Sequence, residues 1–473
     1  MVTATATTAP TLSESAIQQL AAAMRGEVIR PGDPGYDEAR KVYNGMIDRR
    51  PALIARCVDA GDVIAAVNFG RENDLLVSVR SGGHHGAGFS VNDNGLVIDL
   101  SPMKGVRVDP VARTARAGGG CTLGDVDHAT HAFGLATPSG IFSTTGVGGI
   151  TLGGGVGHLA RTFGLSLDNV LEVDVVLSDG RFVTANEQQN ADLFWALRGG
   201  GGNFGVVTSF VFKLHPVDTV YAGPMLWPIE KAAEVLRWYA GYLPKAPDEV
   251  NGWFAFLAVP PGPPFPEHLQ GKTMCGVVWC YAGPLDQAEA TFAPIRQLAG
   301  GPALDWVGPM PQPALQSMFD PIYPPGLQWY WKADFFNELT DEAIATHVKF
   351  GSQLPTGLCT MHMYPIDGAA GRVAPDATAW NYRGAKWAQV MVGVSADPAD
   401  NPRTIGWARD YWEAMHPYSA GGAYVNMFME EGADRVKAAY GANYDRLAAI
   451  KTKYDPTNLF RVNQNIKPVA GSR

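Results

Sequence analysis

Two adjacent histidines, His84 and His85, follow a polar loop in which glycine is frequent. The loop, Arg80-Ser81-Gly82-Gly83, comes directly after a valine-rich run over 75–79 that predicts a buried strand. Glycines let backbone N–H groups approach a ligand closely, while an arginine and a serine add a charge and a hydroxyl. The stretch therefore suits an anionic group such as a diphosphate, with two imidazoles beside it. A tight turn with two surface histidines is the alternative.

A second glycine-rich stretch, from Gly146 to Gly157, is the densest in the chain. In regular structure each glycine costs about 0.5–1 kcal/mol relative to alanine. We therefore expect an irregular backbone here, with positive φ angles or a close approach to a ligand. Contact with a ligand is the better explanation.

Two segments match the glycine fingerprint of dinucleotide-binding Rossmann domains. Residues 155–160 fit GxGxxA, and residues 200–205 fit GxGxxG. The fingerprint must follow an apolar strand and open a helix. More glycine precedes the first match, and the second leads into a predicted strand over 206–212. The sequence thus argues against a Rossmann domain.

Length and composition indicate an ordered globular protein of two domains. The chain has 473 residues, and single cores rarely grow past roughly 250–300 residues. The net charge is −9 and no Lys/Arg-rich run occurs, so we expect neither nucleic acid nor an anionic membrane as a partner. No signal peptide and no apolar run long enough to span a bilayer is found, which predicts a soluble, cytoplasmic protein.

The five cysteines do not suggest a disulfide framework or a metal site. Their number is odd, and none belongs to a CxxC pair or lies at ligand spacing from a histidine. We expect reduced thiols and no metal.

The order of predicted elements favours an α+β fold. Helices are expected over 13–24, with Ser13 as the cap, and over 60–73 and 123–132, and a strand is expected over 51–56. From Gly95 onward short strands over 96–100, 105–108 and 114–117 indicate an antiparallel group. The middle of the chain is rich in β-structure, with strands over 253–259, 272–281 and 387–394 and a helix over 341–354.

Taken together, these segments resemble the FAD-linked oxidases of the vanillyl-alcohol-oxidase fold, specifically the berberine-bridge-enzyme-like branch. The matching pieces are Arg80 to His84, Thr145 to Gly157, Arg161 to Leu165 with Asp168-Asn169, Asp192 to Gly205, and Tyr454 to Arg461. Their order and spacing extend over most of the chain, which makes the resemblance far more specific than any single glycine motif.

The resemblance implies a PCMH-type FAD-binding domain of two α+β subdomains over 1–218. A substrate domain with an antiparallel sheet flanked by helices follows over 219–420, and a C-terminal segment over 421–473 returns to the FAD domain. The implied cofactor-binding residues are Val79, Arg80, Ser81, Gly82, Gly83, His84, His85, Gly146, Val147, Gly148, Gly149, Ile150, Val156, Gly202, Val206 and Asn463.

The resemblance also implies a covalent flavin. In the family the histidine after Arg-Ser-Gly-Gly bonds to the flavin 8α-methyl carbon, and that position is His84, with His85 as a neighbour. A neutral imidazole is a competent nucleophile for such a bond. Doubly linked members carry a cysteine where this chain has Phe142, so we expect one histidyl bond and no cysteinyl bond.

The general base is not evident from the resemblance. Relatives that oxidise alcohols or sugars commonly use a tyrosine just after Tyr-x-Asn, and this chain has Met427 there. A second position used by some members falls near Met391 by an ungapped count, and a thioether cannot take a proton. The catalytic candidates are Tyr424, Tyr382 and Tyr364, with His362 and Glu430 as further ones. A tyrosine that only packs, with its hydroxyl satisfied, is the alternative for each.

We therefore predict an FAD-dependent oxidase that transfers hydride from a small-molecule C–H bond to the flavin, with O₂ as acceptor and H₂O₂ as product. A neutral amine gives up hydride without first losing a proton, whereas an alcohol profits from a base. The substrate is accordingly expected to be an amine or a secondary metabolite. The alternatives are a sugar or alcohol oxidase, a dehydrogenase with another acceptor, and a non-catalytic flavin-binding protein.

Overall fold

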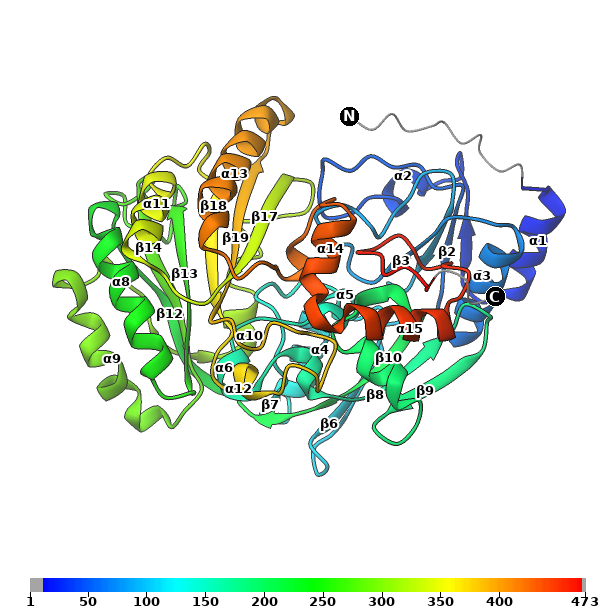
Figure 1. Cartoon of the computed structure of the whole chain (residues 1–473), viewed down its shortest axis with the longest axis horizontal. Coiled ribbons are helices and arrows are strands. Elements are labelled where there is room, and N and C mark those ends of the chain that lie inside the picture. Colours follow the sequence, from blue (N-terminus) through cyan, green and yellow to red (C-terminus); the bar gives the residue numbers. More distant parts are fainter. Residues whose placement is uncertain (1–11, 470–473) are drawn as a thin grey trace.

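The computed structural model describes residues 12–469 of the chain (Figure 1). Residues 1–11, in which we expect no signal peptide, lie outside the described part, as do residues 470–473 at the end of the predicted C-terminal segment.

The first sheet has four strands in the order β1-β2-β4-β3. Their bounds are β1 Glu27–Ile29, β2 Leu53–Arg56, β3 Val77–Arg80 and β4 Leu96–Asp99. The prediction that the strand over 96–100 belongs to an antiparallel group is wrong, because β4 pairs in parallel with both β2 and β3. All residues of β4 are buried, and a strand covered on both faces has the continuous apolar sequence of a parallel sheet.

Helices α1 (Glu14–Ala23) and α3 (Ala60–Glu72) pack on each other beside this sheet, and α2 (Tyr36–Ala39) is a single turn. Ser13 caps α1 as predicted, since its hydroxyl accepts a hydrogen bond from the backbone N–H of Ala16 at 3.2 Å. Apolar residues of α1 and α3 form one core with β2, β3 and β4.

The second sheet is antiparallel, with strand order β5-β6-β10-β8-β9. The hairpin of β5 (Val106–Asp109) and β6 (Thr114–Gly118) is the one that the sequence predicts. The other strands are β8 Val170–Val176, β9 Phe182–Asn186 and β10 Val206–Lys213, and short β7 (Leu135–Ala136) pairs with β11 (His215–Pro216). The helices of this region are α4 Leu123–His131, α5 Val147–Gly153, α6 Ala160–Phe163 and α7 Ala191–Leu197.

The third sheet is the largest and is antiparallel, in the order β15-β12-β14-β13-β18-β19-β17 with β16 paired to β12. Its strands are β12 Thr219–Pro228, β13 Val250–Ala258, β14 Thr273–Tyr281, β15 Leu304–Asp305, β16 Gly308–Pro311, β17 Gln328–Phe336, β18 Thr360–Pro365 and β19 Trp387–Ser395. Three of them are the strands predicted over 253–259, 272–281 and 387–394. The short helices α10 (Gln312–Gln316) and α12 (Ala369–Arg372) lie in its connections.

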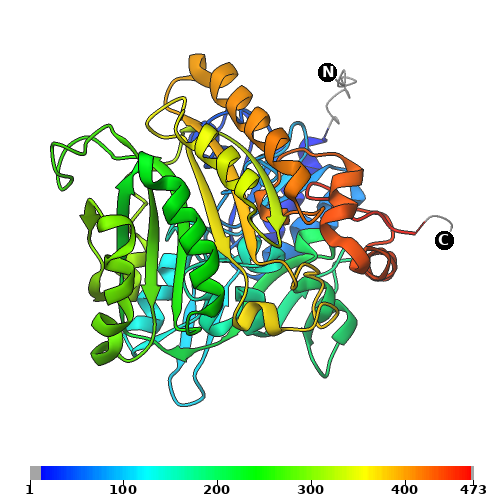
Figure 2. The same cartoon turned by 60° about the vertical axis from the view of Figure 1, so that its left-hand side comes forward.

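One face of the large sheet is covered by helices (Figures 1 and 2). These are α8 Ala232–Tyr242, α9 Ala288–Arg296, α11 Asp341–Gly351 and α13 Asn401–Met415. Successive side chains of a strand point to opposite faces, so Met391 of β19 enters the core beneath the helices, whereas Val390 and Val392 belong to the core on the other face. That other face lies against the N-terminal half and carries the site.

The C-terminal segment, with α14 (Ala433–Tyr440) and α15 (Tyr444–Tyr454), packs against the N-terminal half. The ammonium group of Lys451 donates to the carbonyl oxygens of Asn203 and Phe460 at 2.6 and 2.8 Å and to the Asp455 carboxylate at 2.7 Å. Asp455 in turn accepts the backbone N–H groups of Leu459 and Phe460. These contacts fix the chain end beside the Gly-rich loop that precedes β10.

Two ion pairs with buried guanidinium groups join the connections of the large sheet to the second sheet region. Arg383 donates to both carboxylate oxygens of Asp168, at 2.7 and 2.8 Å. Arg161 donates to Asp367 at 2.7 Å. Both arginine side chains are almost fully buried, so the two pairs hold the two halves in a fixed arrangement.

Within residues 12–469 no helix combines the length and the apolar character that crossing a membrane requires. The same residues contain no cluster of His, Cys, Asp and Glu side chains that could bind a metal ion. All five cysteines are buried and free.

Candidate active site

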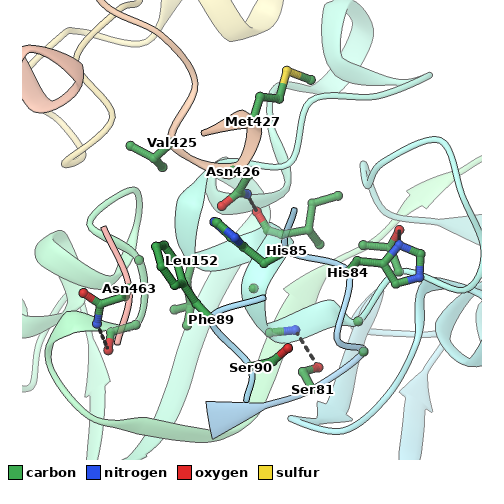
Figure 3. A pocket seen from close by; sticks show the side chains of 18 of the residues that line it. Ser81, His84, His85, Phe89, Ser90, Leu152, Val425, Asn426, Met427 and Asn463 are labelled. Carbon is green, nitrogen blue, oxygen red and sulfur yellow. Dashed lines mark hydrogen bonds between the residues drawn. The ribbon is translucent and has the colours of Figure 1, made fainter. Parts of the chain in front are cut away.

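A cavity lies between the loops of the N-terminal half and the helix-free face of the large sheet. Figure 3 shows its side around Ser81, His85 and Asn426. Most of the predicted cofactor-binding residues line it, namely Val79, Ser81, Gly82, Gly83, His84, His85, Gly146, Gly148, Gly149, Ile150, Val156, Gly202 and Asn463. The opposite wall consists of side chains from β17, β18 and β19, and the residues around Asn426 and Asn463 close one side. The cavity therefore draws on all three parts of the chain.

The loop after β3 and the start of α5 pack backbone against backbone. A Cβ atom on Gly82 would meet the Gly146 nitrogen at 2.2 Å, so neither position has room for a side chain. The backbone N–H of Gly148 donates to the Ser81 hydroxyl at 3.3 Å, as Figure 3 shows. A Cβ atom on Gly149 would meet nothing within 4 Å, so this part of the wall is open to a ligand.

The prediction of an irregular backbone over the second glycine stretch is only partly right. Residues 147–153 form the helix α5, and positive φ angles begin at Gly154 and Gly155. Within the helix, glycine is required for close packing: a Cβ atom on Gly153 would meet Asn426 Oδ1 at 2.1 Å. The Rossmann alternative fails because α5, and no strand, precedes the first fingerprint match.

Arg80, Val147 and Val206, which we predicted as cofactor-binding residues, do not line the cavity. The Arg80 guanidinium donates to the two carboxylate oxygens of Asp99 at 3.1 and 2.6 Å and also to the Ala39 carbonyl. It therefore anchors the end of β3 to β4 and is not available to an anion. Val147 and Val206 are buried in the hydrophobic cores. The motif gives their sequence positions but not the direction of their side chains.

His84 is half-buried in the cavity wall. Its ring stacks on that of Tyr43, with centroids 3.9 Å apart and 17° between the planes, and its Nδ1 atom lies 3.4 Å from the Thr145 hydroxyl. Burial lowers the pKa of His84 to about 4. The imidazole is therefore neutral near pH 7 and keeps a lone pair for bond formation.

His85 points to a different part of the cavity from His84, toward Leu152 and Asn426 (Figure 3). Its Nδ1 atom accepts a hydrogen bond from the backbone N–H of Ala87 at 3.2 Å, and its ring stacks on Phe89 with centroids 4.5 Å apart. Burial lowers the pKa of His85 to about 4 as well. The two histidines thus share a protonation state but not a position.

Phe142 lines the cavity at the place where doubly linked relatives of the family carry cysteine. Its ring meets those of Phe319 and Tyr323 edge to face, with centroids 6.4 and 6.0 Å away. The sulfur atom needed for a second flavin bond is absent at this position.

Tyr424 lines the cavity, and its phenolic oxygen accepts two hydrogen bonds. The donors are the backbone N–H of Gly155 at 2.7 Å and the Asn426 amide at 2.8 Å. Burial still raises the pKa of Tyr424 to about 12, so the hydroxyl remains protonated near neutral pH. Tyr424 is thereby a fixed part of the wall that ties residues 424–426 to the region of α5.

Tyr364 and His362 of β18 both line the cavity, and Tyr364 Oη lies 2.7 Å from His362 Nδ1. Burial lowers the pKa of His362 to about 3 and raises that of Tyr364. The two side chains form a neutral, hydrogen-bonded pair that can exchange a proton.

The other candidate bases lie elsewhere. Tyr382 is not among the residues that line the cavity; its hydroxyl donates to the Ala438 carbonyl at 2.8 Å and its ring stacks on Phe335. Glu430 is exposed and pairs with Arg49. The predicted base position at Met391 faces the helices, and the neighbouring positions that reach the cavity are Val390 and Val392. Met427 lines the cavity and supplies no base.

Sequence reasoning missed two tyrosines of the wall, Tyr43 and Tyr323. The Tyr43 hydroxyl donates to the Tyr323 carbonyl at 2.6 Å across 280 positions of the chain. Neither residue belongs to a glycine motif or to a periodic element, and only tertiary structure brings them together. Their aromatic character was the one available signal.

The cavity carries no formal charge in the described part of the chain. Its lining residues include no Asp, Glu, Lys or Arg, and burial keeps His84, His85 and His362 neutral near pH 7. An anionic diphosphate placed here would be held by backbone N–H groups and hydroxyls. Buried polar atoms without a protein partner, Ser90 Oγ and Asn463 Oδ1, remain available to such a ligand.

A glycine-rich cradle, formed by residues 81–83 and 146–149 of an α+β domain, faces one side of an antiparallel sheet. This architecture is that of the PCMH-type FAD-linked oxidoreductases. Comparison with known proteins agrees. Residues 51–186 match the model of the FAD binding domain, and residues 423–467 match the model described as "Berberine and berberine like".

Individual proteins give the same result. An FAD-linked oxidoreductase of Dictyostelium discoideum is 33% identical over 96% of this chain and 97% of its own length. Among solved structures, 6-hydroxy-D-nicotine oxidase from Arthrobacter nicotinovorans superposes with a TM-score of 0.84 at 28% identity, over 94% of this chain and 98% of that one. A chitooligosaccharide oxidase superposes with a TM-score of 0.83 at 25% identity, over 96% of this chain and 100% of that one. The chain belongs to the berberine-bridge-enzyme-like family of FAD-linked oxidoreductases.

Proposed function

We propose that this protein is an oxidase that oxidises a small-molecule C–H bond of an amine or another secondary metabolite, with O₂ as electron acceptor and H₂O₂ as product. The observation that carries the proposal is the single cavity that joins the glycine cradle to the aromatic wall of the large sheet. When bound there, FAD would supply the redox chemistry by accepting hydride from the substrate and passing electrons to O₂.

The residues present fit such a cofactor. The backbone of the loop after β3 and of α5 would hold the diphosphate, because the close contact of Gly82 with Gly146 and the open space at Gly149 leave N–H groups accessible. The Ser90 hydroxyl and the Asn463 amide oxygen would form hydrogen bonds with polar groups of the cofactor. The protein itself would bind and orient the substrate and exclude water from it, since the wall is largely apolar and has no charged side chain within residues 12–469.

The proposal includes one covalent bond, from His84 to the flavin 8α carbon. A neutral imidazole held against Tyr43 is a fixed nucleophile. The ring nitrogen would replace one hydrogen of the 8α-methyl group. The methyl C–H and the imidazole N–H would each give up a proton, and O₂ would take up these two protons with the two electrons released and become H₂O₂. Phe142 supplies no second bond.

We further propose the division 1–218, 219–420 and 421–473 for the FAD-binding domain, the substrate domain and the C-terminal segment. Its support is that β11 ends at Pro216, β12 begins at Thr219 and α13 ends at Met415. The C-terminal segment then contributes Phe460, Asn463 and Gln464 to the cavity.

Oxidation of a sugar is the second candidate. The likeness to a chitooligosaccharide oxidase favours it, and the rings of Trp329 and Trp331 in the wall suit the flat face of a pyranose.

The test is to mix the yellow protein anaerobically with amines, alcohols and sugars, to follow bleaching of the flavin absorbance, and then to add air. We expect an amine or a secondary metabolite to bleach the flavin and air to restore it within seconds with formation of H₂O₂. Recovery only over many minutes would indicate a dehydrogenase with another acceptor. If no compound bleaches a flavin that dithionite reduces, the protein binds flavin without catalysis.

A further inference from the structure

β18 carries a polar pair into a wall that is otherwise apolar. Tyr364 Oη and His362 Nδ1 are 2.7 Å apart, and both side chains are more than nine-tenths buried and line the cavity. Residues two positions apart on a strand point to the same face, so the backbone itself fixes this pair. Trp253 supports it from behind, with ring centroids 4.7 Å from His362 and 5.7 Å from Tyr364.

The geometry allows the pair to accept a proton. If a substrate hydroxyl donates to Tyr364 Oη, the phenolic proton can move along the existing hydrogen bond to His362 Nδ1. The phenolic oxygen is then neutral again, and the added charge lies on the imidazole. Neither Met427 nor the Val390 and Val392 side chains of β19 can do this.

The walls around the pair determine what kind of substrate fits. Trp329 and Trp331 of β17 line the cavity, and their indole N–H groups have no hydrogen-bond partner within residues 12–469. No charged side chain lines the cavity in that part of the chain. Burying an unpaired charge is costly, so this part of the wall favours an uncharged, flat substrate that accepts hydrogen bonds through oxygen.

Resting on the proposed function, we propose that the substrate is an uncharged aromatic or unsaturated cyclic alcohol and that the Tyr364–His362 pair accepts its hydroxyl proton. The O–H bond breaks, its proton goes to Tyr364 Oη, and the Tyr364 proton goes to His362 Nδ1. The carbinol C–H leaves as hydride to the oxidised cofactor, and the C–O bond becomes C=O. O₂ then takes up the two electrons with two protons, one from the hydride and one from His362, and gives H₂O₂.

The chain contains a matched control for this pair. Tyr411 Oη and His347 Nδ1 are also 2.7 Å apart and fully buried, but they lie in the core beneath the helices on the other face of the sheet. Tyr411→Phe therefore removes the same kind of hydrogen bond at a place without contact to the cavity. An effect that follows from lost packing or folding would be shared by both variants.

The experiment measures anaerobic flavin bleaching by 4-methoxybenzyl alcohol, with benzylamine and glucose as the cationic and the sugar comparison. We expect the alcohol to bleach the wild-type flavin at a rate that does not change between pH 6 and pH 9. Tyr364→Phe should slow it about 100-fold or more, and His362→Gln should slow it by a similar factor, the usual size of a general-base contribution. The residual rate of Tyr364→Phe should rise about tenfold per pH unit, because only the ionised alcohol then reacts. Tyr411→Phe should stay within twofold of wild type.

A second measurement needs no turnover. Calorimetric titration of the oxidised holoenzyme should show 4-methoxybenzaldehyde binding at least tenfold more tightly than 4-methoxybenzoate, because only the second carries a charge into the cavity.

Several outcomes would overturn the inference. These are a Tyr364→Phe rate within threefold of wild type, a pH profile that the substitution does not change, or binding of the benzoate as tight as that of the aldehyde. Bleaching by benzylamine or glucose but not by the alcohol would overturn this inference and leave the proposed oxidase standing. Failure of all three reductants with a flavin that dithionite reduces would count against both.

Discussion

At the residue scale, the side chain of His84 is the one expected to attach the flavin. Its imidazole is held between the Tyr43 ring and the Thr145 hydroxyl and is neutral near pH 7. We expect acid-precipitated wild-type protein to stay yellow and a peptide containing His84 to carry the mass of one FAD. His84→Ala should release all its flavin on precipitation.

His85→Ala is the control for this prediction, since its ring faces another part of the cavity and its Nδ1 already accepts from Ala87. The variant should keep the flavin bound through acid. Wild-type protein that loses its flavin to acid, or a label on His85, would refute the assignment to His84.

Asp127 of α4 is a buried carboxyl with one oxygen, Oδ2, that has no partner within residues 12–469. Burial raises its pKa from 3.8 to about 7, although a hydrogen bond with Gln312 acts in the other direction. A folded-state pKa above the unfolded value means that the fold favours the protonated form. Stability from this group is present below about pH 4 and is lost as the pH rises toward 7.

Asp127→Asn should therefore gain stability over wild type as the pH rises, by up to about 1.4 kcal/mol per pH unit between pH 4 and 7. Urea unfolding at several pH values measures the difference. Thr122→Ala is the control on the same helix: the Thr122 hydroxyl caps the helix by accepting from the backbone N–H of Asp125, so this variant should be about 0.5–2 kcal/mol less stable at pH 7. A constant difference between Asp127→Asn and wild type at all pH values would contradict the raised pKa.

Motifs predicted the residues of the cradle because glycine at fixed spacing reports a backbone requirement, as at Gly82, Gly146 and Gly149. The resemblance identified Phe142 and Met427 as standing where relatives carry a cysteine or a tyrosine, and both residues line the cavity. Motifs did not show that Arg80 turns to Asp99 or that Tyr382 turns to Ala438, because a side chain's direction depends on partners far away in the sequence. Tyr43 could not be predicted as a wall residue for the same reason, because its partner Tyr323 lies far away in the sequence.

At the scale of elements, the C-terminal segment depends on one buried cation. Lys451 lies on α15 and satisfies the carbonyls of Asn203 and Phe460 together with the Asp455 carboxylate. Lys451→Met leaves that carboxylate buried without a counter-charge. We expect a loss of about 3–5 kcal/mol in the free energy of unfolding and weaker flavin retention, because Phe460 and Asn463 line the cavity.

Lys453→Met tests the same charge change on the same helix at an exposed ion pair with Asp192. It should cost no more than about 1 kcal/mol. Equal losses for the two variants in urea unfolding would show that burial of Lys451 contributes nothing.

Most elements could be predicted because their periodicity is strong, and α1, α3, α4, α11 and the long strands begin and end within a few residues of the expected positions. One prediction was wrong and one was only partly right, each for an identifiable reason. The apolar sequence of β4 does not show whether its neighbouring strands run parallel or antiparallel to it. The glycines of α5 reflect close packing against Ser81 and Asn426, and sequence cannot separate such packing from a ligand contact.

At the scale of the whole molecule, the pair of Arg383 with Asp168 is one of the two buried ion pairs that join the two halves. Arg383→Met removes a bidentate partner and leaves the Asp168 carboxylate buried. We expect a loss of about 3–5 kcal/mol, and Arg383→Lys should recover only part of it because an ammonium cannot make both bonds.

Arg181→Met, at an exposed pair with Asp179, is the control and should change the free energy of unfolding by no more than about 1 kcal/mol. Urea unfolding measures these free energies, and following it by both tryptophan and flavin fluorescence shows whether the two halves unfold together. Coincident transitions and unchanged stability for Arg383→Met would show that the pair does not couple the halves.

The cavity wall has no ionic group among the residues that the structure describes, so substrate binding resembles transfer between two liquid phases. A substrate entering this space leaves water for a medium of indole, phenol and aliphatic groups. Affinities across a series of substrates should then follow their partition coefficients between water and octanol, at about 0.8 kcal/mol for each added methylene. Association should also be insensitive to ionic strength, because no charge on the wall attracts the incoming molecule. The enzyme would thus select its substrates as an extracting solvent does, and the shape of the aromatic wall would refine that selection.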